Sequence, residues 1–314
     1  MAGGPVIDRY KGALIGLAAG DALRTTLEFK EKGSFSRIDD MIGGGPFRLK
    51  PGEWTDDTSM ALCLAESLAE RGFDPHDQMA RYVRWWREGH WSSTGRCFDI
   101  GNTVRAALAK FERTGVAFAG SSDPQAAGNG SLMRLAPVPL SYARDASEAV
   151  RLAAESSRTT HAAPEAIDAC RYFAALIVGA LRGQDKSELL ASQFAPEGVD
   201  WRAVPLAPAI ARIADGSFKN RGEDEIRASG YVVHTLEAAL WAFFNSETFQ
   251  DGALLAVNLG EDADTTGAVY GQLAGAYYGV DAIPEGWRGR IAMGAEIESL
   301  ASRLHGLDGA RDAE

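Results

Sequence analysis

Two short segments of this sequence each place carboxylates and hydroxyls within a single turn of chain. They are Thr55-Asp56-Asp57-Thr58 and Asp262-Ala263-Asp264-Thr265-Thr266. The two lie far apart in the sequence, so a local rule such as helix capping gives no reason for the second to repeat the chemistry of the first. A ligand shared by both segments in the folded chain would give that reason.

Each acidic segment comes directly before an apolar helical pattern and is therefore expected at a helix N-terminus. Met60 and Leu64 follow the first, and Val269 and Leu273 follow the second. Thr and Asp are preferred N-cap residues, so each segment taken alone could be no more than a cap. If the segments meet, each pair of carboxylates about 4 Å apart costs on the order of 4 kcal/mol at an effective dielectric of about 20. Helix capping does not require several carboxylates close together, whereas binding a divalent cation does.

The donor atoms of the two segments are all hard oxygens of Asp and Thr, with no His or Cys between them. This donor set favours Mg²⁺ or Mn²⁺ over Zn²⁺. Two such ions about 3.5–4 Å apart can orient a substrate and lower the pKa of a bound water. The sequence therefore predicts a two-metal site with Mg²⁺ or Mn²⁺ as the cofactor.

The composition is that of an acidic globular protein. The chain has 314 residues, 46% of them hydrophobic, with 32 Lys+Arg against 43 Asp+Glu and a net charge of −11. A chain with this charge has no basic surplus for binding nucleic acid non-specifically. A small ligand or a divalent cation is the expected partner.

The cysteines and the apolar runs favour a cytoplasmic protein without a membrane anchor. Cys63, Cys97 and Cys170 form no CxxC pair, which argues against a disulfide framework and a thiolate zinc site. The apolar run 13–19 is short and Asp8 lies just before it where a signal peptide has its basic n-region, so a secretory signal is not expected. The run 172–181 is about half as long as a membrane span and is expected to be a core helix.

Hydrophobic periodicity is helical along nearly the whole chain, and no segment alternates as a strand would. The fold is predicted to be all-α and multi-helical, with a polar, frayed tail over 305–314. The length alone leaves one or two domains open, and a single domain over 1–304 is the division expected. The stretch 195–224 is rich in Pro and Gly and is expected to form a long connection or short helices. Helices are expected at about 8–21, 56–71, 75–89, 101–113, 145–157, 164–182, 230–244, 249–259 and 264–279.

Five motifs occur in order along the chain. They are Gly20-Asp21-Ala22-Leu23 with Glu28-Phe29, Trp54-Thr55-Asp56-Asp57-Thr58, Gly128-Asn129-Gly130-Ser131-Leu132-Met133-Arg134, Thr160-His161, and Gly260-Glu261-Asp262-Ala263-Asp264-Thr265-Thr266-Gly267-Ala268. In order and spacing the chain resembles the ADP-ribosylglycohydrolase family, which includes the dinitrogenase reductase-activating glycohydrolase. One such motif would be weak, but five in sequence are specific. The resemblance implies a compact multi-helix fold of that family with a binuclear metal site.

The resemblance also assigns metal ligands. The family binds two divalent ions through a Thr-Asp-Asp segment and a later Asp-x-Asp-Thr segment, which implies as ligands Thr55, Asp56, Asp57, Asp262, Asp264 and Thr265. The family glutamate corresponds to Glu28, which would lie beside the ions and bind one directly or through water. Taken alone, Glu28 is a surface carboxylate in a loop. Catalytic roles are expected for Asp56, Asp57, Asp264 and Glu28.

Substrate contacts follow from the same resemblance. Family members hold the ADP-ribose phosphates with a Gly-Asn-Gly loop, and glycines let backbone N–H groups approach an anion. The same residues could form an ordinary Asn-Gly turn. His161 resembles a family histidine near the phosphate and ribose, whereas a lone His at a helix start is more often structural. The expected substrate-binding residues are Gly128, Asn129, Gly130, Ser131 and His161.

Two further positions carry information on specificity. Asp99 resembles an aspartate that arginine-directed members place near the ribose and leaving group, so it is a catalytic candidate; as a plain sequence feature it would cap the next helix. Arg24 departs from the family, whose members usually carry a small residue there. If that position needs a positive φ, Arg is costly.

The resemblance implies a Mg²⁺- or Mn²⁺-dependent hydrolase that removes ADP-ribose from a mono-ADP-ribosylated protein or small acceptor by cleaving the C1″ glycosidic bond. Asp99 favours an arginine linkage. Two alternatives stay open: a metal-dependent phosphohydrolase of a nucleotide-type substrate, and a non-catalytic ADP-ribose-binding or structural relative. The sequence leaves open the linkage, the choice of ion, the oligomeric state and the effect of Arg24.

Overall fold

The computed structural model describes residues 6–24 and 34–310. Within these ranges every regular element is a helix, and β-pairing is limited to isolated bridges. Short 3-10 turns join some of the helices. The α-helices are α1 (Val6–Arg24), α2 (Asp56–Arg71), α3 (Pro75–Glu88), α4 (Asn102–Thr114), α5 (Pro137–Ser141), α6 (Ala146–Arg158), α7 (Pro164–Leu181), α8 (Lys186–Leu189), α9 (Pro208–Ala214), α10 (Val232–Phe244), α11 (Phe249–Val257), α12 (Ala263–Tyr278), α13 (Glu285–Arg288) and α14 (Gly294–Ala310).

The all-α prediction is confirmed for these residues, and each helix expected from periodicity is present within a few residues of its predicted ends. The helices not expected are α5, α8, α13 and α14. All but α14 are too short to show a hydrophobic period. As expected, the stretch 195–224 holds short helices joined by irregular chain.

The C-terminal end differs from the expected frayed tail. Helix α14 continues to Ala310, and residues 311–314 lie outside the described ranges. Asp308 in its last turns is buried and accepts hydrogen bonds from the Tyr10 hydroxyl (2.8 Å) and the Arg144 backbone N–H (3.1 Å). These bonds hold the helix end against α1 and the chain after α5.

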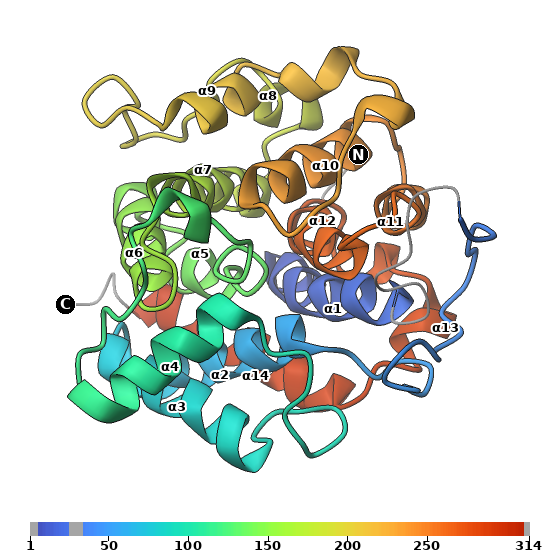
Figure 1. The fold of residues 1–314 in the computed structure, drawn as a ribbon. Coiled ribbons are helices and arrows are strands. Elements are labelled where there is room, and N and C mark those ends of the chain that lie inside the picture. Colours follow the sequence, from blue (N-terminus) through green and yellow to red (C-terminus); the bar gives the residue numbers. More distant parts are fainter. Residues whose placement is uncertain (1–5, 25–33, 311–314) are drawn as a thin grey trace.

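Helices α1 and α12 lie side by side and antiparallel at the centre of the molecule (Figure 1). Three pairs of glycines face each other across the contact: Gly12 with Gly275, Gly16 with Gly271, and Gly20 with Gly267. A Cβ atom on any of the six would lie within 2.5 Å of a backbone oxygen of the opposite helix. The backbones therefore approach more closely than side chains allow, which brings the C-terminal end of α1 to the N-terminal end of α12.

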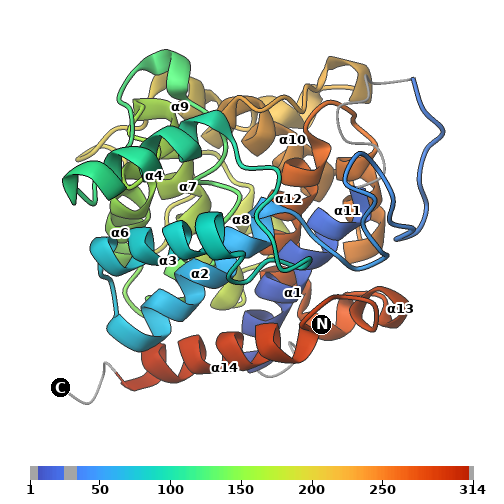
Figure 2. The same cartoon turned by 60° about the horizontal axis from the view of Figure 1, so that its bottom comes forward.

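The other helices pack around this central pair. Helix α14 runs beneath α1 and α2 (Figure 2), and α7, expected as a core helix, is buried along the run Tyr172–Leu181. One large hydrophobic cluster includes residues from Tyr10 to Leu304. Across the described ranges, no helix has the length and apolarity needed to cross a bilayer, and the three cysteines are free thiols.

Candidate active site

Asp21, at the end of α1, organises the start of α2. Its side chain is fully buried, and its carboxylate accepts hydrogen bonds from the hydroxyls of Thr55 (2.9 Å) and Thr58 (2.6 Å) and from both backbone N–H groups (2.9 and 3.1 Å). Thr55 occupies the N-cap position of α2 but its side chain makes no capping hydrogen bond. The free amides of α2 are thus satisfied by a neighbouring helix. Sequence analysis gave Asp21 no role.

Asp57 connects the two acidic segments. Its Oδ2 atom lies 3.1 Å from Oγ1 of Thr55 and 3.5 Å from Oγ1 of Thr265. Its Oδ1 atom is buried and accepts no hydrogen bond from any described residue. Such an orphaned carboxylate oxygen is costly unless a ligand satisfies it. The structure therefore brings both segments together around an incompletely satisfied acid.

The carboxylates of this region are crowded. Burial raises the pKa of Asp56 well above its usual range, and the charges of Asp99 and Asp57 raise it further. Burial likewise raises the pKa of Asp57, with added effects of Asp21 and Asp264. The pKa of Asp21 is also raised by burial, although the hydrogen bonds from the two threonines oppose the shift. A cation would relieve this repulsion.

The residues fit a hard divalent cation by their chemistry. The donors are oxygens, one buried carboxylate oxygen lacks a partner, and the N-cap residue Asp262 also makes no side-chain capping bond. Capping therefore does not explain either segment. Among residues 6–24 and 34–310, no group of three or more His, Cys, Asp or Glu side chains is already arranged as an ion site. Glu28 lies outside the described residues.

We expect Mg²⁺ or Mn²⁺ to raise the melting temperature more near pH 7.5 than near pH 5. A folded-state pKa raised above the unfolded value gives stability that is present below the unfolded pKa and is lost as the pH rises through the folded pKa. At about pH 5 the ion must displace protons, whereas near neutrality it meets ionised carboxylates. An ion at about 100 times its Kd adds ~2.7 kcal/mol. Thermal melts at both pH values check this; an equal effect at both, or none near pH 7.5, would contradict it.

A cavity of about 620 Å³ opens beside the acidic segments. It collects residues from α2, α4, α12 and the loops before α4, α5, α7, α10 and α12. Of the predicted site residues, those that line it are Asp56, Asp99, Gly128, Asn129, Gly130, His161, Asp262, Asp264 and Thr265. Lining residues that sequence analysis missed include Asn102, Met133, Arg227, Ser229 and Glu261. Thr55, Asp57 and Ser131 lie behind the lining.

The Gly128–Ser131 loop has an internal role in addition to any contact with substrate. The Asn129 amide donates to Oδ2 of Asp262 (2.8 Å) and to the Thr235 hydroxyl (3.0 Å), so its N–H groups position the second acidic segment. Ser131 points away from the cavity: its hydroxyl accepts from the Ser157 hydroxyl at 2.8 Å. The loop therefore offers substrate its backbone and its glycines more than its side chains.

Two acidic residues beside the cavity have left-handed backbones. Asp99 has φ +58° and Glu261 has φ +59°. Residues other than glycine adopt this conformation at a cost, and such residues gather at functional sites. Asp99 does not cap α4, whose N-cap is Gly101. Arg24, by contrast, is the last residue of the helix α1, so its position does not require a positive φ.

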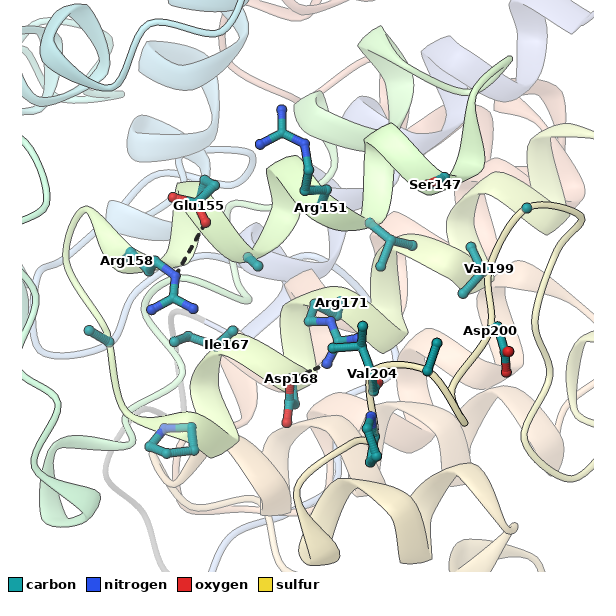
Figure 3. A pocket seen from close by; sticks show the side chains of 17 residues that line it. Ser147, Arg151, Glu155, Arg158, Ile167, Asp168, Arg171, Val199, Asp200 and Val204 are labelled. Carbon is teal, nitrogen blue, oxygen red and sulfur yellow. Dashed lines mark hydrogen bonds and ion pairs between the residues drawn. The ribbon is translucent and has the colours of Figure 1, made fainter.

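A second cavity, of about 710 Å³, lies between α6, α7 and the segment 198–205 (Figure 3). Its charged side chains largely pair with one another. Arg171 donates to Asp168 (2.7 Å) and to the Val204 carbonyl (2.8 Å), and Arg158 lies 3.4 Å from Glu155. Because it lacks crowded like charges, we place the candidate active site in the first cavity.

The comparisons with known proteins point to proteins named for action on ADP-ribosyl groups. The family profile described as ADP-ribosylglycohydrolase matches residues 3–314. The ADP-ribosylarginine hydrolases Tri1 of Pseudomonas putida and Serratia proteamaculans are 48% and 43% identical; the alignments cover 95% of this chain and 78% and 79% of theirs. The ADP-ribosyl-[dinitrogen reductase] glycohydrolase of Rhodospirillum rubrum is 35% identical over 95% of both chains. A solved structure described as an ADP-ribosylglycohydrolase-related protein complex superposes with a TM-score of 0.85, at 48% identity, over 96% of this chain and 99% of that one.

Proposed function

This chain belongs to the ADP-ribosylglycohydrolase family, and on that premise we propose that it hydrolyses the C1″ glycosidic bond of a mono-ADP-ribosylated substrate. The observation that carries the proposal is the meeting of the two acidic segments at Asp57 and Thr265, beside a cavity that also holds the Gly128–Gly130 loop and His161. The partner is an ADP-ribosylated protein or a small ADP-ribosyl compound.

An arginine linkage is the proposed target. The relatives at 48% and 43% identity are named ADP-ribosylarginine hydrolases. The cavity of this chain carries carboxylates at Asp99 and Glu261, and carboxylates accept paired hydrogen bonds from a guanidinium group. A serine-linked substrate offers no such cation.

The residues proposed to hold two divalent cations, Mg²⁺ or Mn²⁺, are Thr55, Asp56, Asp57, Asp262, Asp264 and Thr265. When bound, the ions would supply positive charge beside the ribose and make water easier to deprotonate. Binding ions here would also satisfy the orphaned Oδ1 atom of Asp57.

The chain itself provides orientation and proton transfer. Asp56 and Asp264 both line the cavity, and either carboxylate can accept the proton of the water that attacks C1″. Asn129 holds Asp262 in place through its amide, and Asp21 holds the first turn of α2. Asp99 is the candidate to receive the departing guanidinium group. These roles divide the acids into those that face substrate and those that position them.

Product analysis distinguishes this activity from the alternatives. With Mg²⁺ and an ADP-ribosylated arginine peptide, we expect intact ADP-ribose and an unmodified arginine, because the bond broken is the one at C1″. Release of AMP would instead show cleavage of the pyrophosphate and support a phosphohydrolase. Binding of ADP-ribose without any release from the peptide would support a non-catalytic relative. The cytoplasmic location predicted from the sequence stays a prediction.

A further inference from the structure

Arg134 is a cation enclosed by neutral acceptors. Its side chain is fully buried, and it donates to the Gly130 carbonyl, to the Tyr82 hydroxyl (3.1 Å) and to the Thr160 hydroxyl (2.8 Å). Within the described ranges the ion pairs include none between Arg134 and a carboxylate. A buried charge without an opposite charge is costly, so its position directly behind the loop of the cavity calls for an explanation.

The contacts of Thr160 favour one position for the ring proton of His161. Oγ1 of Thr160 accepts from Nη2 of Arg134, and among the described residues the acceptor recorded for its own proton is Nδ1 of His161, 2.9 Å away. Nδ1 is then the acceptor, and the imidazole proton lies on Nε2. Burial, with the charge of Arg134, lowers the pKa of His161 to about 3, which agrees with a neutral ring.

The Nε2 edge of the ring lies against the loop glycines Gly128 and Gly130, which also line the cavity. His161 lines the cavity, and no described residue forms a hydrogen bond with Nε2. The loop glycines make room for this edge: a Cβ atom on Gly128 would lie 3.3 Å from Nε2, and one on Gly130 would lie 2.9 Å from Cε1. A side chain at either position would push the imidazole out of place.

We propose that Arg134 acts through Thr160 as a positioning residue, fixing His161 as the Nε2–H tautomer so that this N–H group donates to the diphosphate of the substrate. The same guanidinium also adds uncompensated positive charge behind the Gly128–Gly130 wall, where an anion would lie. This inference rests on the proposed function for the identity of the anion, but the tautomer is a property of the free protein.

The tautomer can be measured without activity. The chain has five histidines, and in protein labelled with ¹⁵N-histidine the ring nitrogen shifts distinguish Nε2–H from Nδ1–H; His161→Gln assigns the signal. Wild type and Thr160→Ser should show the Nε2–H form. Thr160→Val keeps the shape but lacks the hydroxyl that donates to Nδ1, so its Nδ1 signal should move to the position of an acceptor nitrogen without a hydrogen bond. An Nδ1–H wild type, or a Thr160→Val protein with an unchanged spectrum, would overturn the inference.

Binding tests the contact with the diphosphate, with ADP-ribose as the probe in calorimetry. Thr160→Val should bind ADP-ribose about tenfold more weakly than Thr160→Ser, the value of one hydrogen bond to a charged group. Adenosine, which lacks the diphosphate, should not distinguish the two variants.

In turnover, the KM of Thr160→Val should rise while its kcat stays nearly unchanged. Equal ADP-ribose affinity of the two variants would overturn the proposed contact. If the tautomer spectra and the ADP-ribose binding are as expected but no ADP-ribose is released from a modified peptide, the proposed function is contradicted and the inference about His161 is not.

Discussion

Asp57→Asn should lower the rate of ADP-ribose release by about 10² or more, the scale of losing a key transition-state contact. Asn has the shape of Asp but no charge, and Asp57 carries both the orphaned Oδ1 atom and the contact with Thr265. The ion-free variant should be at least as stable as wild type, because one member of a repelling carboxylate group is removed. The rise in melting temperature with Mg²⁺ should shrink. Single-turnover assays and thermal melts measure both effects.

Asp308→Asn is the matched control. Asp308 is also a buried aspartate, but it lies on α14 and does not line the cavity. It accepts hydrogen bonds from the Tyr10 hydroxyl and from the Arg144 backbone N–H. This variant should lose stability and keep its catalytic rate. Loss of activity without loss of stability in Asp57→Asn, and the reverse in Asp308→Asn, is the expected pattern. An Asp57→Asn enzyme with wild-type turnover in Mg²⁺ would remove Asp57 from the metal site.

Gly271→Ala should reduce the free energy of unfolding by about 3 kcal/mol or more, at the upper end of overpacking effects. The added Cβ would lie 1.9 Å from the Gly16 carbonyl oxygen, and a backbone atom inside a helix cannot move aside as a side chain does. If the variant folds, α1 must shift from α12, which displaces Asp21 from Thr55 and Thr58. Activity should then fall together with stability. Urea denaturation and the same turnover assay measure the two effects.

Gly306→Ala isolates the packing effect from helix propensity. Gly306 also lies in a helix, α14, but nothing is within 4 Å of the position that its Cβ would occupy. Ala is favoured over Gly in a helix by roughly 1 kcal/mol, so Gly306→Ala should be slightly stabilising. If Gly271→Ala were equally stabilising, the close approach of α1 and α12 would not be what sets the position of the site.

Much of the fold could be predicted from the sequence because the long helices carry a clear period and end at glycines or polar caps. Gly72, Gly89 and Gly279 are the C-cap residues of α2, α3 and α12, whereas α11 ends at Asn258, two residues before Gly260. The sequence also contains a signal for the antiparallel glycine contact, since glycines recur every fourth residue in both 12–20 and 267–275. Asp21 directly follows the first of these glycine repeats.

The parts that could not be predicted depend on tertiary contacts. The local sequence does not predict that the Asn129 amide donates to Asp262, or that the Ser131 hydroxyl accepts from Ser157. The left-handed backbone of Glu261 is uncommon for this residue type, so the sequence does not predict it. Arg134 belongs to a motif quoted for its glycines and asparagine, and its connection to His161 through Thr160 exists only in the folded chain.

The most direct test compares two linkages in one assay. Wild-type protein and Asp57→Asn are each incubated with Mg²⁺ and with peptides carrying ADP-ribose on arginine or on serine, and free ADP-ribose is measured over time. We expect the wild type to release ADP-ribose rapidly from the arginine-linked peptide and much more slowly from the serine-linked peptide, and Asp57→Asn to release almost none. Release of no ADP-ribose from either peptide by the wild-type protein, or equal release by both proteins, would contradict this expectation.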